Sequence, residues 1–267
     1  MASKKILWTT DIHLNFLTDN DLELFIADIK NQSPDALLIG GDIGEAPSVC
    51  SYLRKLEQSI DCPIYFVLGN HDYYRGSLSK VNEDIQRLSK SSKKLIFLDA
   101  VPFIELTKEV ALVGYGGWAD GKFGDYDAYN ILLNDYILIK EFIGLNKNQR
   151  LKKLNELGSE AASKIEDDLI SAFKNHKKVL CLTHVPPFKE SCWHEGKISD
   201  DDYLPHFSCK SVGVMMNKIM QTKPDCYLEV LCGHTHSSGS AQILDNLKVI
   251  TGKASYGKPE IQKIIYL

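Results

Sequence analysis

The chain has 267 residues and a mass of 30.0 kDa, 44% of its residues are hydrophobic, and its formal net charge is −4 at pH 7. This length suits one large domain, or one domain with an inserted cap, and no apolar stretch approaches the roughly 20 residues that a membrane span needs. The negative charge excludes a global basic field for long nucleic acid, although a local basic groove stays open.

The first residues and the cysteines favour a cytoplasmic protein. Residues 1–5 lead into a short strand-like run, whereas a signal peptide would continue into an apolar core. The seven cysteines are an odd number and include no Cys-x-x-Cys pair. Neither a disulfide framework nor a thiolate zinc site is therefore indicated.

Strands and helices are expected to alternate in the N-terminal third of the chain. Apolar runs at residues 6–10, 36–39 and 64–68 predict strands. Apolar residues at helical spacing predict a helix at residues 21–30, with Thr18 or Asp19 as its cap. The same spacing predicts helices that begin at Pro47 and at residue 77, the second of them running to residue 89.

The alternation then gives way to short apolar runs with few helix signals. Residues 95–98, 102–106 and 110–115 resemble consecutive strands with short connections. A meander of this kind, following alternating strands and helices, predicts a mixed sheet.

The composition changes between residues 116 and 176. Residues 116–125 form a glycine-rich loop with aromatic residues, and helical patterns follow at residues 128–143 and 149–175. We interpret residues 116–176 as a helical cap or insertion within a single domain of residues 1–267. The alternative is that these are ordinary flanking helices of the main domain.

The last third returns to short strands. Strands are predicted at residues 179–183, up to residue 232, and near residues 242–244, 248–251 and 261–266, with a helix at 212–220. Residues 186–205 form a long loop without periodicity, and loops of this length in compact domains are often functional. We expect this loop and residues 116–125 to form the substrate wall, with Trp118, Trp193 and His194 as pocket residues.

Five of the apolar runs end in turns that carry polar side chains, and five of the eight histidines lie in these turns. Because ligand sites in open α/β sheets lie beyond the carboxyl ends of the strands, these turns are expected to converge on one crevice. In chain order, the polar residues are Asp11 and His13, then Asp42, then Asn70, His71 and Asp72, then His184, then His234 and His236.

These turns offer seven good metal ligands. Seven are too many for one tetrahedral zinc ion but fit two ions that share a bridging carboxylate. Two cations about 3.5 to 4 Å apart can clamp an in-line displacement at phosphorus, so phosphate ester hydrolysis is the natural reaction. The seven are Asp11, His13, Asp42, Asn70, His184, His234 and His236.

In the residues of these five turns, the chain resembles the calcineurin-like metallophosphoesterase superfamily. The motifs occur in the family's order and span residues 11 to 236. The resemblance implies a four-layer α/β/β/α sandwich of two mixed β-sheets flanked by helices, here with a helical insertion. The motifs are Asp11-x-His13, Gly41-Asp42-x-x-Glu45, Gly69-Asn70-His71-Asp72, His184 and Gly233-His234-x-His236.

The resemblance also implies a role for each motif residue. His71 would donate a proton to the leaving oxygen and Asp72 would orient it, whereas Glu45 would either serve the site or only cap its loop. The ions would be two divalent or trivalent transition metals, manganese, iron or zinc, whose identity the sequence leaves open. One metal would be held by Asp11, His13 and His236, the other by Asn70, His184 and His234, with Asp42 bridging.

The expected function is that of a dinuclear phosphoesterase that hydrolyses phosphate monoesters or diesters by attack of a metal-activated water. The substrate would be a small phosphate ester or a phosphoprotein. A nuclease of the same superfamily is one alternative, and it would need a basic groove lined by aromatic residues. A non-catalytic metal-binding scaffold is the other.

Overall fold

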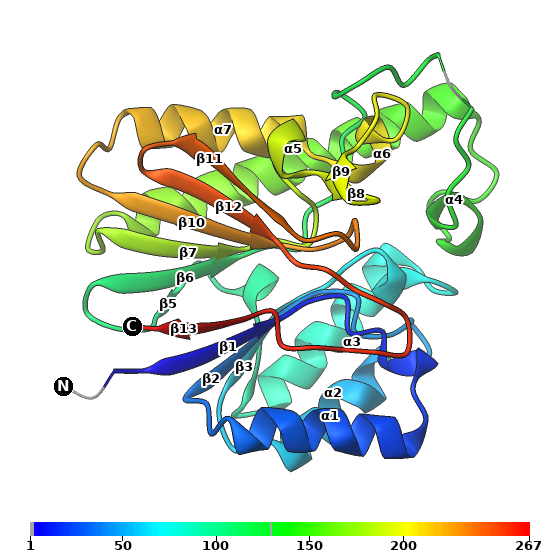
Figure 1. Ribbon diagram of the computed structural model, residues 1–267. Helices are drawn as coiled ribbons and strands as arrows, with labels where there is room; N and C mark the ends of the chain where they lie inside the picture. The colour runs from blue at the N-terminus through cyan, green and yellow to red at the C-terminus, as the bar shows by residue number, and fades with distance from the viewer. Residues whose placement is uncertain (1–2, 129) are drawn as a thin grey trace.

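Two β-sheets lie face to face between two layers of helices (Figure 1). The computed structural model describes residues 3–128 and 130–267. Within these ranges, no helix combines the length and the apolar character that a membrane crossing requires. The two facing sheets and the helices on either side confirm the predicted four-layer α/β/β/α architecture of two mixed sheets flanked by helices.

The first sheet has five strands, of which four are parallel. The C-terminal strand β13 (Lys263–Tyr266) returns to this sheet and pairs with the N-terminal strand in antiparallel orientation. The sheet order is β13-β1-β2-β3-β4. The other strands are β1 (Lys5–Thr9), β2 (Ala36–Gly40), β3 (Ile64–Val67) and β4 (Leu95–Phe97).

Three amphipathic helices cover the outer face of the first sheet (Figure 1). Thr18 and Ser77 cap two of them through side-chain oxygens that accept hydrogen bonds from the backbone N–H groups of Asp21 and Lys80. Their apolar faces, buried against the sheet, form one core cluster. The helices are α1 (Asp19–Asn31), α2 (Val49–Ser59) and α3 (Leu78–Ser91).

The second sheet has six strands in the order β11-β12-β10-β7-β6-β5. Its four central strands are parallel, and an antiparallel strand closes each edge. The strands are β5 (Ile104–Glu105), β6 (Val110–Gly114), β7 (Lys178–Leu182), β10 (Tyr227–Cys232), β11 (Gly239–Leu244) and β12 (Leu247–Thr251).

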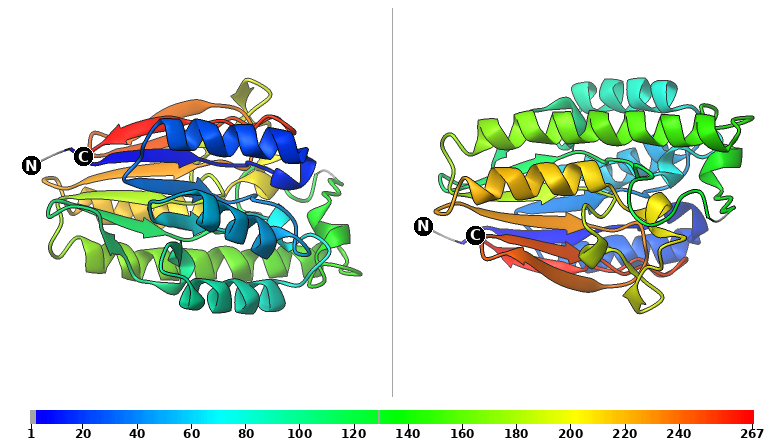
Figure 2. Two further views of the ribbon diagram at one scale, coloured as in Figure 1. Left: turned by 90° about the horizontal axis from the view of Figure 1, so that it is seen from below. Right: turned by 90° about the horizontal axis from the view of Figure 1, so that it is seen from above.

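Two helices cover the outer face of the second sheet, as the view from above shows (Figure 2). They are α5 (Lys147–Ala172), which begins with a capping box of Asn146 and Gln149, and α7 (Lys210–Gln221). Their buried residues and the sheet form a second core cluster. The helix predicted at residues 149–175 therefore belongs to the outer layer.

The inner faces of the two sheets form a third core. It joins Ile6 and Trp8 of the first sheet to Leu180 and Leu231 of the second, and none of the four is more than 1% exposed. Strands with both faces buried read as continuous apolar runs. This explains why the strands could be predicted from apolar runs. Because neighbouring strands are parallel, their carboxyl ends and the turns that follow lie at the same edge.

The segment between β6 and α5 differs from the prediction. Instead of a helix at residues 128–143, the described residues contain only α4 (Asp135–Leu138), and residue 129 lies outside them. The backbone of Leu138 and Lys140 pairs with the loop at residues 75–76, and Ile139 is buried. Tertiary hydrogen bonds thus satisfy the backbone groups that a longer helix would have paired internally.

Two smaller expectations also change. The three runs predicted as one meander divide between the sheets, because η3 (Leu98–Ala100) leads from β4 of the first sheet to β5 and β6 of the second. The predicted loop at residues 186–205 contains short elements of its own. These are η4 (Lys189–Ser191) and a hairpin of β8 (Trp193–His194) and β9 (Lys197–Ile198), and α6 (Leu204–Phe207) begins at the end of the loop.

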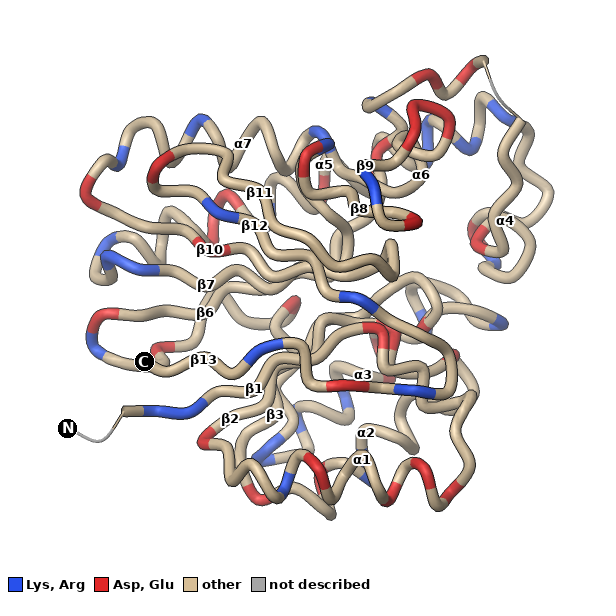
Figure 3. Tube along the Cα trace, in the orientation of Figure 1, with Lys and Arg blue, Asp and Glu red and all other residues tan. Residues whose placement is uncertain are grey.

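The charged residues are mixed along the described part of the chain. In the view of Figure 3, lysines and arginines alternate with aspartates and glutamates over the outer helices and loops, without a continuous basic stripe. This distribution gives no support to a groove for a polyanion.

Candidate metal centre

The five polar turns lie at one edge of the sandwich, beyond the carboxyl ends of β1, β2, β3, β7 and β10 (Figure 1). The structure brings all seven predicted ligands together there, and five of them are at least 93% buried. The other two, His234 and His236, are partly buried, and the side chain of His236 is 25% exposed. The cluster therefore has a closed base and one open side.

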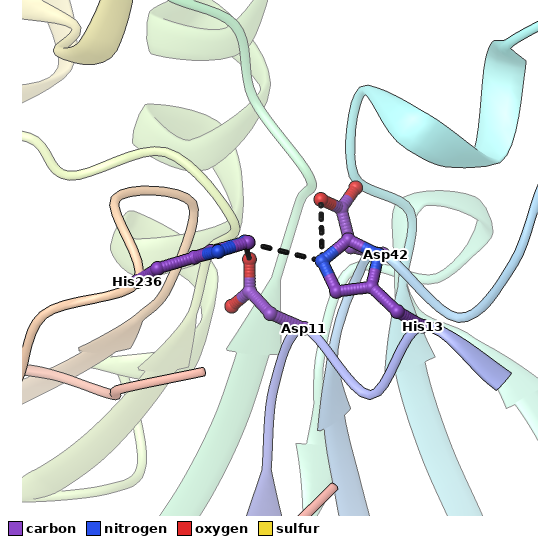
Figure 4. A group of neighbouring side chains, drawn as sticks. All are labelled: Asp11, His13, Asp42 and His236. Carbon is purple, nitrogen blue, oxygen red and sulfur yellow. Dashed lines mark hydrogen bonds and ion pairs between the residues drawn. The ribbon is translucent and has the colours of Figure 1, made fainter. Parts of the chain in front are cut away.

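The first group consists of Asp11, His13, Asp42 and His236, whose ligand atoms all lie within 4.8 Å of one another (Figure 4). The Nε2 atoms of His13 and His236 are 3.1 Å apart. His236 Nε2 is 3.5 Å from Asp11 Oδ1, and His13 Nε2 is 3.7 Å from Asp42 Oδ2. Nitrogen and carboxylate donors in this arrangement suit a transition-metal ion.

The second group lies on the other side of Asp42. Asn70 Oδ1 is 2.9 Å from His234 Nδ1 and 3.1 Å from His184 Nε2. His184 Nε2 is also 3.4 Å from Asp42 Oδ1. Asp42 thus directs one carboxylate oxygen to each group, as a bridging ligand would.

Two of the histidines are held in a tautomer that leaves the inner nitrogen free. His184 Nδ1 lies 2.9 Å from the Gly40 carbonyl, and His234 Nε2 lies 3.4 Å from the carbonyl of His206. A carbonyl oxygen can only accept, so these nitrogens carry the proton. The opposite ring nitrogen of each histidine therefore presents a lone pair to the cluster.

Five of the seven cluster residues have a backbone conformation that is rare outside glycine. Positive φ costs free energy in residues with a Cβ, and such strain concentrates at functional sites. Here it directs side chains from successive turns toward one point. The φ angles are 50° at Asp11, 40° at His13, 52° at Asp42, 73° at His234 and 58° at His236.

The glycines of two motifs are required by space. A Cβ at Gly69 would lie 2.2 Å from Asp42 Oδ1, and a Cβ at Gly233 would lie 2.0 Å from Asp11 Oδ2. Any larger residue at either position would displace a carboxylate of the cluster. The motif glycines therefore make room for the ligands beside them.

Burial favours the neutral form of two of the histidines. It lowers the pKa of His13 and of His234 to about 3, although the negative charge of Asp11 opposes this in both. Burial also raises the pKa of Asp42, and the charges of Asp11 and Asp72 add to the effect. Neutral imidazole is the form that binds metal, so His13 and His234 are in the form that a cation requires.

Asp72 does not orient His71, and this prediction was wrong. Its Oδ1 accepts hydrogen bonds from the backbone N–H groups of Ile43 and Gly44, and its Oδ2 accepts one from Gly69, all at 2.9 Å. No hydrogen bond joins it to the His71 ring among the described residues. Asp72 instead fastens the turn after β2 to the turn after β3.

His71 lies in η2 (His71–Tyr73), at the side of the cluster. Its Nε2 is 3.9 Å from Asp42 Oδ2, its ring stacks on Tyr74 with centroids 4.2 Å apart, and its side chain is 15% exposed. Its backbone N–H donates to Asp42 Oδ1 at 2.9 Å. The ring therefore stands next to the cluster with an open path to a bound molecule.

A cavity of about 210 Å³ opens onto the cluster. It is lined mainly by aromatic and polar side chains, and none of the described residues that line it is lysine or arginine. The lining residues are Asn70, His71, Tyr74, Leu133, Asn134, Asp135, His194, Phe207, His234, Thr235, His236 and Tyr256.

Several of these residues were missed by the sequence analysis. Tyr256 follows β12, a strand parallel to β10. The expectation that turns beyond the carboxyl ends of the strands converge on one crevice could therefore have included it. Its ring is 4.7 Å from those of His13 and Phe16, and both aromatic residues are about half exposed at the rim. Asp135 lies in a short helix within the stretch that was predicted as one long helix, and Phe207 lies in a short helix that no pattern indicated.

The expected substrate wall is only partly present. Trp118 is 7% exposed, stacks on Phe142 and contacts Tyr73 in the core. The stretch at residues 116–125 does not line the cavity. Trp193 packs against Gly239, where a Cβ would lie 2.2 Å from its ring. From the loop at residues 186–205, His194 alone lines the cavity.

Glu45 does not join the cluster. Its carboxylate pairs with the guanidinium of Arg75, beside the turn that carries His71. Of the two roles left open for Glu45, the structure favours the one that stabilises the loop.

Comparison with known proteins agrees with this geometry. A family model described as calcineurin-like phosphoesterase matches residues 4–238. The fold and the cluster of carboxylates and histidines fit this family. The chain belongs to the calcineurin-like phosphoesterase family, and the resemblance seen in its motifs is confirmed.

Two curated relatives match shorter segments. A probable cyclic nucleotide phosphodiesterase of Pseudoalteromonas sp. (strain SM9913) is 38% identical over 84 residues, which are 27% of this chain and 32% of the relative. An uncharacterized metallophosphoesterase of Campylobacter jejuni is 33% identical over 99 residues, 36% of this chain and 25% of the relative. Each match thus spans less than a third of the relative's own length, 32% in the first and 25% in the second.

Solved structures share the fold over most of the chain. The phosphopantetheinyl hydrolase from Mycobacterium tuberculosis has a TM-score of 0.66 at 13% identity and covers 96% of this chain and 90% of its own. A dimetal phosphatase from Danio rerio has a TM-score of 0.56 at 12% identity, covering 96% and 89%. At these identities, the likeness establishes the fold alone.

Proposed function

We propose that this protein is a dinuclear metal-dependent phosphoesterase that hydrolyses small phosphate monoesters or diesters. The observation that carries the proposal is Asp42, whose Oδ2 lies 3.7 Å from His13 Nε2 and whose Oδ1 lies 3.4 Å from His184 Nε2. A single carboxylate between two sets of ligands is what two neighbouring cations require. The description of the Danio rerio structure as a dimetal phosphatase agrees with this.

The donor set fits two transition-metal ions. Asp11, His13 and His236 would hold one, Asn70, His184 and His234 the other, with Asp42 shared between them. Nitrogen, carboxylate and amide donors accept manganese, iron or zinc, so the choice among these follows metal supply. When bound, two such cations activate a water and neutralise the phosphoryl oxygens during in-line displacement.

The residues of the chain supply the remaining steps. The buried base of the cluster excludes bulk water from the inner side of the phosphate, so an ester enters from the cavity. His71 stands at that entrance, and we assign it the proton that the leaving oxygen takes up. Its backbone N–H holds the Asp42 carboxylate in place at the same time.

The cavity favours a small ester whose leaving group carries no phosphate or carboxylate substituent. A phosphorylated or carboxylated leaving group would find no lysine or arginine among the described lining residues, and Asp135 would repel it. The exposed rings of Phe16 and Tyr256 offer apolar surface beside the cluster. The same absence of basic groups makes a nuclease the weaker alternative.

Residues 117–128 and 130–146 are the described part of the expected cap that lies outside the two sheets and their covering helices (Figure 1). Asn134 and Asp135 of this segment line the cavity. We propose that the chain is one domain in which this segment closes one side of the substrate site.

A panel of phosphate monoesters and diesters, assayed with added Mn²⁺, tests the proposed function. The Pseudoalteromonas relative is described as a probable cyclic nucleotide phosphodiesterase, so cyclic diesters belong in the panel. We expect turnover of at least one ester class, its loss on chelation, and its recovery when Mn²⁺ is restored. Bound metal without hydrolysis of any ester would favour the scaffold, and hydrolysis of DNA alone would favour the nuclease.

A further inference from the structure

The amide of Asn70 is held from the side opposite the metal cluster. Its Nδ2 donates hydrogen bonds to Asp135 Oδ1 at 2.8 Å and to the Tyr74 hydroxyl at 3.1 Å. Its Oδ1 lies 2.9 Å from His234 Nδ1 and 3.1 Å from His184 Nε2. The two ends of one amide thus meet two different chemical environments.

We propose that Asp135 is a positioning residue that fixes the orientation of the Asn70 amide and thereby builds the second metal site. A carboxylate can only accept hydrogen bonds, so it holds the NH₂ end of the amide and turns the oxygen toward the cluster. An amide turned the other way would offer the cation a donor group. The inference rests on the proposed function, because it assigns Asn70 as a ligand.

Tyr74 cannot set this orientation alone. Its hydroxyl lies 2.6 Å from Asp135 Oδ1 and donates to it, which leaves its lone pairs to face Asn70 Nδ2. Without the carboxylate, the hydroxyl proton would be free to turn toward either end of the amide. The preference for one orientation therefore comes from Asp135.

The position of Asp135 is built into the fold. The side chains of Asp135, Tyr74 and Asn70 are all at least 93% buried, so solvent does not compete for their hydrogen bonds. Downstream, the Arg75 N–H donates to the Leu138 carbonyl at 2.9 Å. These contacts fasten the segment that carries Asp135 to the turn that carries Asn70.

A second backbone contact and a buried anchor complete this attachment. The N–H of Lys140 donates to the Gly76 carbonyl at 3.0 Å, and Leu78 N–H donates to Glu141 Oε2, also at 3.0 Å. Phe142 is 1% exposed within the core under the first sheet. The segment between β6 and α5 therefore supports the metal site, in addition to lining the cavity.

The test is a calorimetric titration of the full chain, freed of metal by chelation, with Mn²⁺ alone. Wild type is expected to bind two equivalents. Asp135→Leu, which keeps the approximate volume and removes the acceptor, is expected to weaken one of the two sites about 10- to 100-fold, the typical loss when an outer hydrogen-bond partner of a ligand is removed. The site of Asp11, His13 and His236 should keep its affinity.

Two further variants separate positioning from a general structural role. Asp135→Asn retains a carbonyl oxygen that can accept from Asn70 Nδ2 but also carries an NH₂ group, so it should bind Mn²⁺ more tightly than Asp135→Leu and more weakly than wild type. Tyr74→Phe retains the carboxylate and should lose distinctly less than Asp135→Leu. Thermal unfolding of each variant reports stability separately, because a merely structural role would lower the unfolding midpoint without weakening one site selectively.

The inference is overturned if folded Asp135→Leu binds both equivalents with wild-type affinity, or if Tyr74→Phe loses as much affinity as Asp135→Leu. Should the leucine variant fail to fold, Asp135→Ala admits water and carries the same expected and contradicting results. Wild type that binds no Mn²⁺ would end the proposed function and this inference together. Wild type with two equivalents and an unaffected Asp135 variant would end the inference alone.

Discussion

Asp42→Ala is expected to lose both metal ions and all metal-dependent ester hydrolysis, whereas Asp11→Ala weakens mainly one site. Asp42 is the one predicted ligand that faces both groups, at 3.7 Å from His13 Nε2 and 3.4 Å from His184 Nε2. Its removal also leaves two cations poorly screened from each other. Loss of an outer partner typically costs 10- to 100-fold in metal affinity, so loss of a shared ligand should cost more than about 100-fold.

Metal content after gel filtration, measured by mass spectrometry, checks this prediction. Asp42→Asn is the matched control, because it keeps an oxygen that can accept from the His71 N–H while it removes the charge. It should hold metal better than the alanine variant and more weakly than wild type. Equal metal stoichiometry in wild type and Asp42→Ala would contradict the bridging role.

His71→Asn is expected to keep its metals and to lose turnover of alkyl phosphate esters by about 10²- to 10⁴-fold, the usual contribution of a positioned acid. A leaving alkoxide of high pKa needs a proton in the transition state, whereas p-nitrophenolate leaves readily without one. Hydrolysis of p-nitrophenyl esters should therefore fall distinctly less. The measurement is kcat for both ester classes under conditions in which chemistry limits the rate.

The pKa of His71 must rise when the substrate binds if the ring is to donate a proton. Burial, with the charges of His13 and His184, lowers the pKa of His71 to about 2. A bound phosphate acts in the opposite direction, because a nearby negative charge favours the protonated ring. If His71→Asn lost metal, or slowed both ester classes equally, the assignment as proton donor would be wrong.

Asp72→Asn serves as the control for this prediction. Its carboxylate contacts the backbone N–H groups of Ile43, Gly44 and Gly69, so its loss should lower the thermal unfolding midpoint. It should not reproduce the bias between alkyl and p-nitrophenyl esters. A matching bias in Asp72→Asn would restore the orienting role that the contacts do not support.

The fold was largely predictable because its signals are local. Buried parallel strands read as apolar runs, and turns whose backbone passes close to a carboxylate need glycine, as Gly69 and Gly233 show. Where each strand ends, the residues of the following turn share one edge of the sheet. The convergence of Asp11, Asp42 and His234 therefore follows from strand order and residue type.

The parts that were not predictable depend on tertiary contacts. Asp135 lies in a segment whose apolar residues pack in the core of the first sheet. Their spacing matched that of a long helix, so the sequence did not indicate that the carboxylate lies beside Asn70. Asp72 follows His71 directly in sequence, and only the three-dimensional arrangement shows that it turns to the backbone of another loop. Trp118 lies in a glycine-rich loop, yet its ring is buried.

The most direct test of the account is anomalous X-ray diffraction from crystals grown with Mn²⁺, recorded at the manganese absorption edge. Two anomalous peaks are predicted, about 3.5 to 4 Å apart, as in other two-metal sites. One should lie among Asp11, His13 and His236, the other among Asn70, His184 and His234, with Asp42 between them. A single peak, or two peaks of which neither contacts Asp42, would contradict the dinuclear centre.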